Sequence, residues 1–287
     1  MISETSGRNR WLVSTAWLAE NLNDLNLVIV DGSYYLPAMK RDARAEYLAG
    51  HIPGAVFFDI DEIADHSNKL PHMLPDAETF ARNMARLGIG DGMKIVVYDG
   101  GGLFSAPRVW WTLRLFGAKD VKMLDGGLPQ WRTELRPLES GPVTRPPARF
   151  TAHFEPSWVA DIARVETVLG SGAAQVVDAR SAERFRGEAP EPRPGVRSGR
   201  MPGSKNVPVA GVVENGRLAS PEKIKAAFAA GGVDPEKPII TSCGSGVTAA
   251  TLWLALDAIG KPPQALYDGS WSEWGSLPDK PLKTGAD

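Results

Sequence analysis

The segment KPIITSCGSG, residues 237–246, has a counterpart earlier in the chain, KIVVYDGGG, residues 94–102. Each begins with an apolar, β-branched run and continues into glycines, a pattern typical of a buried strand followed by a tight turn. The later copy contains Cys243, the single cysteine among 287 residues, and the earlier copy has Asp99 at the matching position. The pair predicts two related units, of which one carries a thiol.

Four more pairs of blocks recur in the same order. They are LNLVIVDGS (25–33) with AAQVVDARS (173–181), GHIPGAVFFDI (50–60) with GRMPGSKNVPV (199–209), DAETFARNMARLG (76–88) with SPEKIKAAFAAGG (220–232), and KMLDGGLPQW (122–131) with ALYDGSWSEW (265–274). Such order predicts a tandem duplication. We expect domains at residues 1–135 and 150–287, joined by an extended linker at residues 136–149, which contain four prolines.

Within each copy, short apolar runs alternate with longer amphipathic segments. Runs that are apolar throughout indicate strands buried on both faces. Each half is therefore expected to be an α/β domain, with a mainly parallel sheet and helices on both faces. In the second copy, Ser220 followed by Pro221 predicts a helix start, and Gly231 predicts its end.

Composition narrows the classes of function. The formal net charge is -2, from 32 basic and 34 acidic residues, so no general field attracts nucleic acid or an anionic membrane. No apolar run approaches the roughly 20 residues that span a bilayer, and we expect a cytoplasmic protein. No metal is expected, because the four histidines lack ligand spacing; they are His51, His66, His72 and His153. No cofactor is expected either, since the glycine run at residues 99–102 aligns with the cysteine loop.

The cysteine loop itself predicts chemistry. Cys243 follows a predicted strand, and open α/β sheets bind ligands beyond the carboxyl ends of their strands. Gly244 and Gly246 allow a turn whose backbone N–H groups point inward, and a helix expected from about Val247 would add its dipole. We expect Thr248 to cap that helix. A lone cysteine is more often a small buried hydrophobe, but this setting favours a stabilised, nucleophilic thiolate.

The loop CGSGVT (243–248), the DAR at 178–180, the segment RSGRMPGSKNVPV (197–209) and the duplication resemble the two-domain rhodanese-type sulfurtransferases, specifically the 3-mercaptopyruvate sulfurtransferases. The resemblance implies two tandem rhodanese-like domains, the first catalytically silent. It also implies that the Cys243 thiolate takes the sulfur of 3-mercaptopyruvate as a persulfide and releases pyruvate. The outer sulfur then passes to cyanide or to a thiol acceptor, for which thioredoxin is a candidate.

The resemblance also assigns roles to residues. Arg184 and Arg193 would hold the substrate carboxylate, with the neighbouring Arg186 left open as an alternative. A relay of Ser245, His72 and Asp61 would move the proton. The loop residues Gly244, Gly246, Val247 and Thr248 would complete the substrate site. Without the resemblance, His72 is better explained as a turn histidine near Pro71.

Three other functions compete with this interpretation. A cysteine phosphatase needs an arginine six positions after its cysteine, where this chain has Ala249. A thiosulfate sulfurtransferase would carry cations beside the cysteine, whereas Gly244 and Ser245 are neutral. A non-catalytic rhodanese-like module that senses sulfur or oxidants is the third, and the complete loop around Cys243 argues against it.

Overall fold

Residues 10–286 are described in the computed structural model, in which they form two compact units. The first unit comprises residues 10–66, Leu74–Glu155 and Asn215–Leu218, and the second comprises Ser67–Met73, Pro156–Glu214 and residues 219–286. The division in the chain falls between Glu155 and Pro156, after the proline-rich segment 136–149 rather than within it. Two short segments, Ser67–Met73 and Asn215–Leu218, each belong to the unit opposite to that of their neighbours in sequence.

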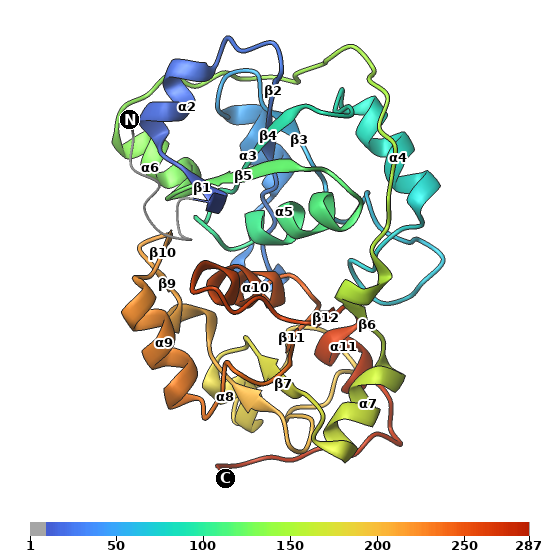
Figure 1. Cartoon of the computed structure of the whole chain (residues 1–287). Coiled ribbons are helices and arrows are strands. Elements are labelled where there is room, and N and C mark those ends of the chain that lie inside the picture. Colours follow the sequence, from blue (N-terminus) through green and yellow to red (C-terminus); the bar gives the residue numbers. More distant parts are fainter. Residues whose placement is uncertain (1–9, 287) are drawn as a thin grey trace. The chain divides into compact units, whose positions relative to one another are not determined.

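The first unit is built around a five-stranded parallel sheet with the strand order β1-β5-β4-β2-β3. Its elements, labelled in Figure 1, are β1 (Leu12–Val13), α2 (Thr15–Asn21), β2 (Leu27–Asp31), the 3-10 helix η1 (Pro37–Met39), α3 (Ala43–Ala49), β3 (Val56–Phe57), α4 (Ala77–Arg86), β4 (Lys94–Tyr98), α5 (Ala106–Leu115), β5 (Asp120–Leu124), α6 (Gly127–Thr133) and β10 (Arg217–Leu218).

The second unit repeats this plan with the strand order β6-β12-β11-β7-β8, again parallel. Its elements are η2 (Pro156–Trp158), β6 (Val159–Ala160), α7 (Ile162–Ser171), β7 (Gln175–Asp178), α8 (Ala182–Arg186), β8 (Lys205–Asn206), η3 (Val209–Gly211), β9 (Val213–Glu214), α9 (Pro221–Ala230), β11 (Ile239–Ser242), α10 (Ala249–Ala258), β12 (Ala265–Tyr267) and α11 (Ser270–Trp274). The shared order confirms the fold class expected from the repeats.

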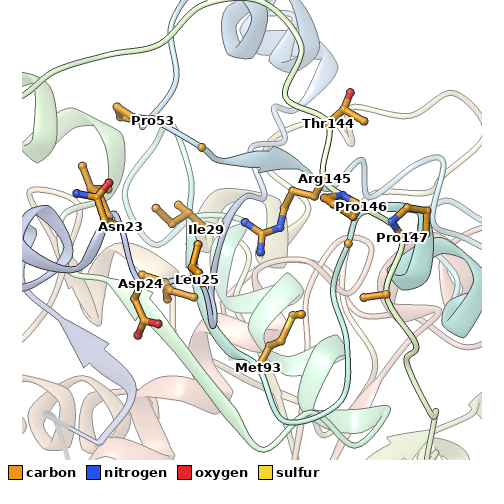
Figure 2. A pocket seen from close by; sticks show the side chains of 15 residues that line it. Asn23, Asp24, Leu25, Ile29, Pro53, Met93, Thr144, Arg145, Pro146 and Pro147 are labelled. Carbon is orange, nitrogen blue, oxygen red and sulfur yellow. The ribbon is translucent and has the colours of Figure 1, made fainter.

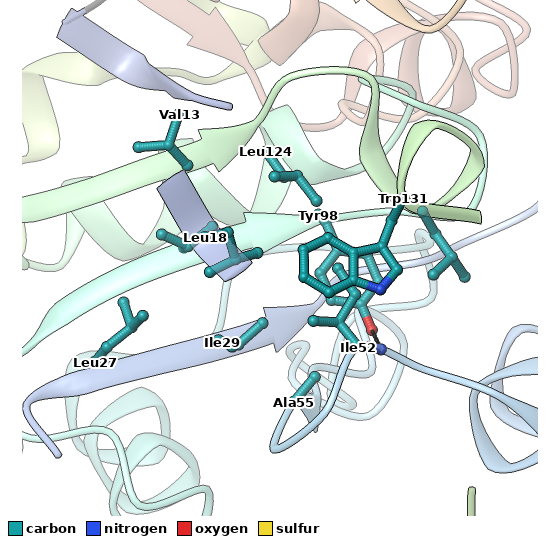
Figure 3. Close-up of a cluster of buried hydrophobic side chains, with 11 residues drawn as sticks. Val13, Leu18, Leu27, Ile29, Ile52, Ala55, Tyr98, Leu124 and Trp131 are labelled. Carbon is teal, nitrogen blue, oxygen red and sulfur yellow. Dashed lines mark hydrogen bonds between the residues drawn. The ribbon is translucent and has the colours of Figure 1, made fainter. Parts of the chain in front are cut away.

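The sheets are buried on both faces, as the apolar runs indicate. In β2, Leu27 and Ile29 point to one face, where they pack with Leu18 of α2 and Trp131 of α6 (Figure 3). The intervening residues Val28 and Val30 point to the opposite face and are also buried. Because α5 contacts β4 and β5 from that opposite face, helices cover both sides of the first sheet (Figure 1).

Capping side chains start the matching helices of the two units. Ser220 precedes α9, and its Oγ accepts the backbone N–H of Lys223 at 3.3 Å, with Pro221 in the first turn. Asp76 does the same for α4, where its Oδ1 accepts the N–H of Thr79 at 2.7 Å. Both caps satisfy N–H groups that the first helical turn leaves unpaired. The predicted helix over residues 221–230 is therefore confirmed, with Gly231 at its C-cap.

The proline-rich segment 136–149 is extended and packs along the first unit. The N–H of His51 donates to the carbonyl of Glu139 at 2.9 Å, and the N–H of Ala148 donates to the carbonyl of Ala85 at 3.1 Å. Through these hydrogen bonds the segment 136–149 is part of the first unit. Within residues 10–286, no helix is long and apolar enough to cross a membrane.

Candidate active site

Cys243 directly follows β11 and is 2% exposed. Its backbone is held by the start of α11: the N–H of Cys243 donates to Ser270 Oγ at 3.2 Å, and its carbonyl accepts the N–H of Trp271 at 3.0 Å. The next carbonyl, that of Gly244, accepts two hydrogen bonds from Ser272: one from its backbone N–H at 2.8 Å and one from its side-chain hydroxyl at 2.6 Å. Three consecutive residues of the last repeated block therefore fix the shape of the cysteine loop.

The loop reaches α10 through a turn that requires glycine. Gly246 has φ +79°, a left-handed conformation that side chains with a Cβ rarely adopt. The helix then begins at Ala249, later than the start expected near Val247. The expected cap at Thr248 is wrong: its backbone is already helical, with φ -75° and ψ -11°, and its side chain makes no capping hydrogen bond. A capping side chain needs an extended backbone to reach the N–H groups of the first turn.

The matching loop of the first unit shows how this kind of turn binds a carboxylate. Asp99 takes the place of the cysteine, and both its carboxylate oxygens are surrounded by backbone N–H groups. Oδ1 accepts from Gly101 at 2.9 Å and from Gly102 at 2.5 Å. Oδ2 accepts from Phe104, Ser105 and Ala106 at 2.9, 2.8 and 2.7 Å. The turn between strand and helix is an anion-binding nest.

The second unit contains the same kind of turn with a sulfur atom in place of the carboxylate. Gly102 and Gly246 occupy matching places and have nearly equal φ angles, +76° and +79°. The described residues offer no hydrogen-bond partner to the backbone N–H groups of Ser245, Val247 or Ala249. These unused backbone donors and the start of α10 follow Cys243 directly in the chain, so they are candidates to stabilise a negative charge on its sulfur.

Arg184 lies against the cysteine loop. It belongs to α8, and a Cβ built on Gly244 would lie 3.0 Å from Arg184 Nη2. Glycine at this position therefore leaves room for the guanidinium beside the loop. The Arg184 side chain is 20% exposed, so it is accessible to a small anion. The structure therefore brings this predicted substrate-binding residue to the cysteine loop.

A buried chain of charges supports Arg184. Glu191 accepts from Arg184 Nη2 at 2.5 Å and from Arg180 Nη1 at 2.7 Å, and Arg180 pairs in turn with Asp178 at 2.8 Å. The side chains of Asp178, Arg180 and Glu191 are at most 3% exposed. Arg180 also lies over the ring of Trp271, 4.5 Å from its centroid. Such buried ions are stable only when paired, so the chain fixes where Arg184 points.

Sequence reasoning missed Glu191 and Ser270. Glu191 lies between Pro190 and Pro192 in the arginine-rich segment, and an acidic residue among arginines was the available signal. Ser270 has no such signal, because its role comes from a positive φ of 49° and a fold that brings it to Cys243.

His72 and Arg193 meet in the second unit. Arg193 Nη2 lies 2.9 Å from His72 Nε2, and His72 is 5% exposed with φ 60°. A guanidinium carries donors only, so this hydrogen bond requires an unprotonated Nε2, and the imidazole is then neutral with its proton on Nδ1. His72 thus holds one of the two predicted carboxylate-binding arginines.

The remaining predicted residues belong to both units. Ser245 lies in the cysteine loop and is 4% exposed. Asp61 belongs to the first unit, where it is exposed on the turn after β3. Arg186 is two places beyond Arg184, but its guanidinium pairs with Glu188 at 2.7 Å instead of lying against the loop.

Comparison with known proteins agrees with this geometry. The model of the rhodanese-like domain family matches residues 14–134 and 161–277, one match in each unit. Two matches in one chain, with a cysteine loop in the second, define a tandem rhodanese-like protein. One similar solved structure is the crystal structure of SseA from Escherichia coli, a 3-mercaptopyruvate sulfotransferase with the rhodanese fold. Its sequence is 45% identical to this chain and the TM-score is 0.85. The match covers 91% of this chain and 98% of SseA.

Two curated relatives match over almost the whole chain. The 3-mercaptopyruvate sulfurtransferase of Escherichia coli O157:H7 is 48% identical over 277 residues, which cover 95% of this chain and 99% of the relative. The thiosulfate sulfurtransferase of Bos taurus is 43% identical over 273 residues, which cover 92% of each chain. The chain belongs to the rhodanese-like family, as a two-domain sulfurtransferase.

The two units differ at the carboxylate that ends the second strand of each repeat. In the second unit, Asp178 is paired with Arg180. In the first unit, the matching Asp31 has Ser33 in the place of the arginine, and its Oδ1 accepts the N–H of Ser33 at 2.9 Å. Burial of this carboxyl without a cation raises the pKa of Asp31 from its usual 3.8 to about 6.

This difference predicts a pH-dependent stability that Asp31→Asn should remove. Because the folded pKa lies above the unfolded one, Asp31 takes up a proton on folding between about pH 4 and 6, and the free energy of unfolding falls as the pH rises through that window. We expect the variant to be more stable than the wild type by up to about 3 kcal/mol at pH 7, with the gain vanishing near pH 4. Urea unfolding at a series of pH values measures the difference.

Asp178→Asn is the matched control. This substitution leaves Arg180 with one buried carboxylate fewer, so we expect it to lower the free energy of unfolding at pH 7. A difference between Asp31→Asn and wild type that is the same at pH 4 and pH 7 would contradict the assignment.

Proposed function

We propose that this sulfurtransferase moves the sulfur of 3-mercaptopyruvate onto Cys243, releases pyruvate, and passes the outer sulfur to a thiol or to cyanide. One observation supports this most: a guanidinium, that of Arg184, lies against the loop of a cysteine placed where the first unit binds a carboxylate. A substrate with a carboxylate at one end and a sulfur at the other fits this pair of features. The relatives that carry this activity by name add to the argument.

The proposed first step is a displacement at sulfur. The Cys243 thiolate attacks the substrate thiol sulfur, an S–S bond forms, and the bond between that sulfur and C3 breaks. The electron pair of the broken bond leaves as the enolate of pyruvate, which takes up one proton. The products are pyruvate and a persulfide on Cys243.

Each part of the site has a role in this step. Arg184 and Arg193 bind the substrate carboxylate, and Arg184 keeps donors for it after its single hydrogen bond to Glu191. The backbone N–H groups from Gly244 to Thr248 stabilise the negative charge on the attacking sulfur and on the persulfide. Ser245, two residues after Cys243, donates to the substrate carbonyl as it becomes an enolate.

A relay from Ser245 through His72 to Asp61 stays a prediction. His72 Nε2 accepts a hydrogen bond from Arg193, so it cannot at the same time accept the Ser245 proton there. Substrate binding that draws Arg193 to the carboxylate would release Nε2 for that purpose. Until then, His72 acts as a positioning residue for Arg193.

The second step requires an external acceptor. Cys243 is the single cysteine, so no second thiol of this chain can take the outer sulfur as a disulfide. A small thiol or the dithiol of thioredoxin attacks the outer sulfur and restores the Cys243 thiolate. A reducing compartment, the cytoplasm, keeps both thiols available.

Thiosulfate is the second candidate substrate, because a relative of similar identity is named for it. Its dianion would gain most from cations at the positions next to the cysteine. Gly244 and Ser245 are neutral, and the guanidinium of Arg184 is the cation that lies against Gly244. We therefore expect thiosulfate to be the poorer substrate.

Pyruvate release with 3-mercaptopyruvate and a thiol acceptor tests the reaction. We expect turnover by the wild type and loss of turnover in Cys243→Ser, because a serine hydroxyl is not ionised at neutral pH and cannot hold sulfane sulfur. The same assay with thiosulfate and cyanide, read as thiocyanate, ranks the two substrates. Pyruvate release by Cys243→Ser at the wild-type rate would contradict the proposal.

Arg184→Gln should lower kcat/KM for 3-mercaptopyruvate by about 10- to 100-fold, because a hydrogen-bonded ion pair with the carboxylate is lost. Arg186→Gln is the control on the same helix, since Arg186 pairs with Glu188, and we expect a change of less than about twofold. Equal losses in the two variants would show that the carboxylate is held elsewhere.

A further inference from the structure

A cavity of about 730 Å³ lies in the first unit, apart from the elements that carry the cysteine loop. Its volume falls within the roughly 300–1,000 Å³ typical of small-molecule sites. The residues that line it are Leu22, Asn23, Asp24, Leu25, Leu27, Ile29, Pro53, Gly54, Gly88, Met93 and Thr144 to Ala148. In Figure 2, the side chain of Arg145 extends into the space between residues 144–147 and Ile29.

One wall of this cavity is a proline strap, residues 143–148. The strap is fixed at both ends: the N–H of Val143 donates to Tyr47 Oη at 3.3 Å, and the N–H of Ala148 donates to the carbonyl of Ala85 at 3.1 Å. Pro146 and Pro147 between these points have no N–H to satisfy. The wall therefore keeps its shape without backbone pairing along the cavity.

Among the described residues, Arg145 is the lining cation of this cavity, and it has no ion-pair partner. Arg145 extends from the strap toward Ile29 and Met93 (Figure 2). Its Nε is buried without a hydrogen-bond partner, and among the described residues none pairs with its guanidinium. Burying part of a charged group without a partner costs free energy that an anion in the cavity would recover.

The other charged lining residue is already paired. Asp24 Oδ2 lies 2.9 Å from Lys94 Nζ, and this hydrogen bond lowers the pKa of Asp24. Because the charges of Asp24 and Lys94 cancel each other, the net charge at the cavity is the single positive charge of Arg145. The remaining side chains at this space are mostly apolar, and Leu25 is 93% exposed at its edge. A cavity with one unpaired cation and mostly apolar walls suits a ligand that has one negative charge and an apolar remainder.

We propose that this cavity binds a small amphipathic monocarboxylate, with its carboxylate on Arg145 and its hydrocarbon part against Leu25, Ile29 and Met93. The site lies wholly in the unit that lacks the cysteine, and it is independent of the sulfur-transfer reaction. It gives the catalytically silent unit a binding function of its own.

A series of straight-chain carboxylates from butanoate to octanoate tests the proposal by isothermal titration calorimetry. Affinity should rise about fourfold for each added methylene, as expected for apolar burial. Octanamide, which has the same body without the charge, should bind about tenfold or more weakly than octanoate. No binding of octanoate at millimolar concentration, or equal binding of octanamide, would overturn the proposal.

Arg145→Gln should weaken octanoate binding by about tenfold or more. Arg149→Gln, an exposed arginine on the same segment that does not line the cavity, should leave it unchanged. Pyruvate release from 3-mercaptopyruvate should be the same in both variants and the wild type, which separates this test from that of the sulfur-transfer reaction. Equal octanoate affinity in the two variants would contradict the assignment of Arg145.

A measurement on the unmutated chain locates the ligand directly. With methyl-labelled methionines, the Met93 resonance, assigned through Met93→Leu, should shift on titration with octanoate. Met201, buried in the second unit, serves as the internal reference and should not shift. A shift at Met201 without one at Met93 would place the ligand outside this cavity and overturn the proposal.

Discussion

The structure depends on one interaction, that between the turn linking a parallel strand to its helix and an anion at its centre. In the first unit, five backbone N–H groups converge on the carboxylate of Asp99. In the second unit, the turn begins with Cys243 and has a left-handed glycine at the matching place, Gly246. The duplicated fold thus made two anion-binding nests. The first is filled by its own side chain, and in the second we propose that the Cys243 sulfur carries a charge during the reaction.

The second nest needs substrate recognition as well as charge stabilisation. We propose that Arg184 provides this recognition, because a buried chain of ion pairs from Asp178 through Arg180 and Glu191 holds its guanidinium in place. Each buried ion in this series is paired with one of opposite charge, which offsets the cost of its burial. Arg184, at the end of the series, lies against Gly244. The first unit lacks the arginine that matches Arg180, and there Asp31 is buried with a raised pKa. The first unit therefore has neither a cysteine at the place of Cys243 nor an arginine at the place of Arg180.

Much of the fold could be predicted from the sequence, because the duplication repeats strong local signals. Buried β-branched runs predicted the strands, and Ser220 followed by Pro221 predicted the start of a helix. The place of Cys243 at a strand end could be predicted from the glycines that follow a buried run, and the place of Arg184 against the cysteine loop could be expected from the resemblance to known sulfurtransferases. Contacts between distant segments could not be predicted: the hydrogen bond between Ser270 and Cys243 and the hydrogen bond between Arg193 and His72 both depend on tertiary placement. Thr248 failed as a cap because helical backbone angles at that residue keep its Oγ from the first turn.

The central claim is that Cys243 carries the transferred sulfur by itself, in a nest built by its own loop. A single-turnover experiment tests this most directly: the protein is mixed with 3-mercaptopyruvate without any acceptor, freed of small molecules, and measured by intact and peptide mass spectrometry. We predict the added mass of one sulfur atom on the peptide containing Cys243, one equivalent of pyruvate, and return to the starting mass when a thiol is added. An unchanged mass after pyruvate release, or an added sulfur on any other residue, would contradict the account.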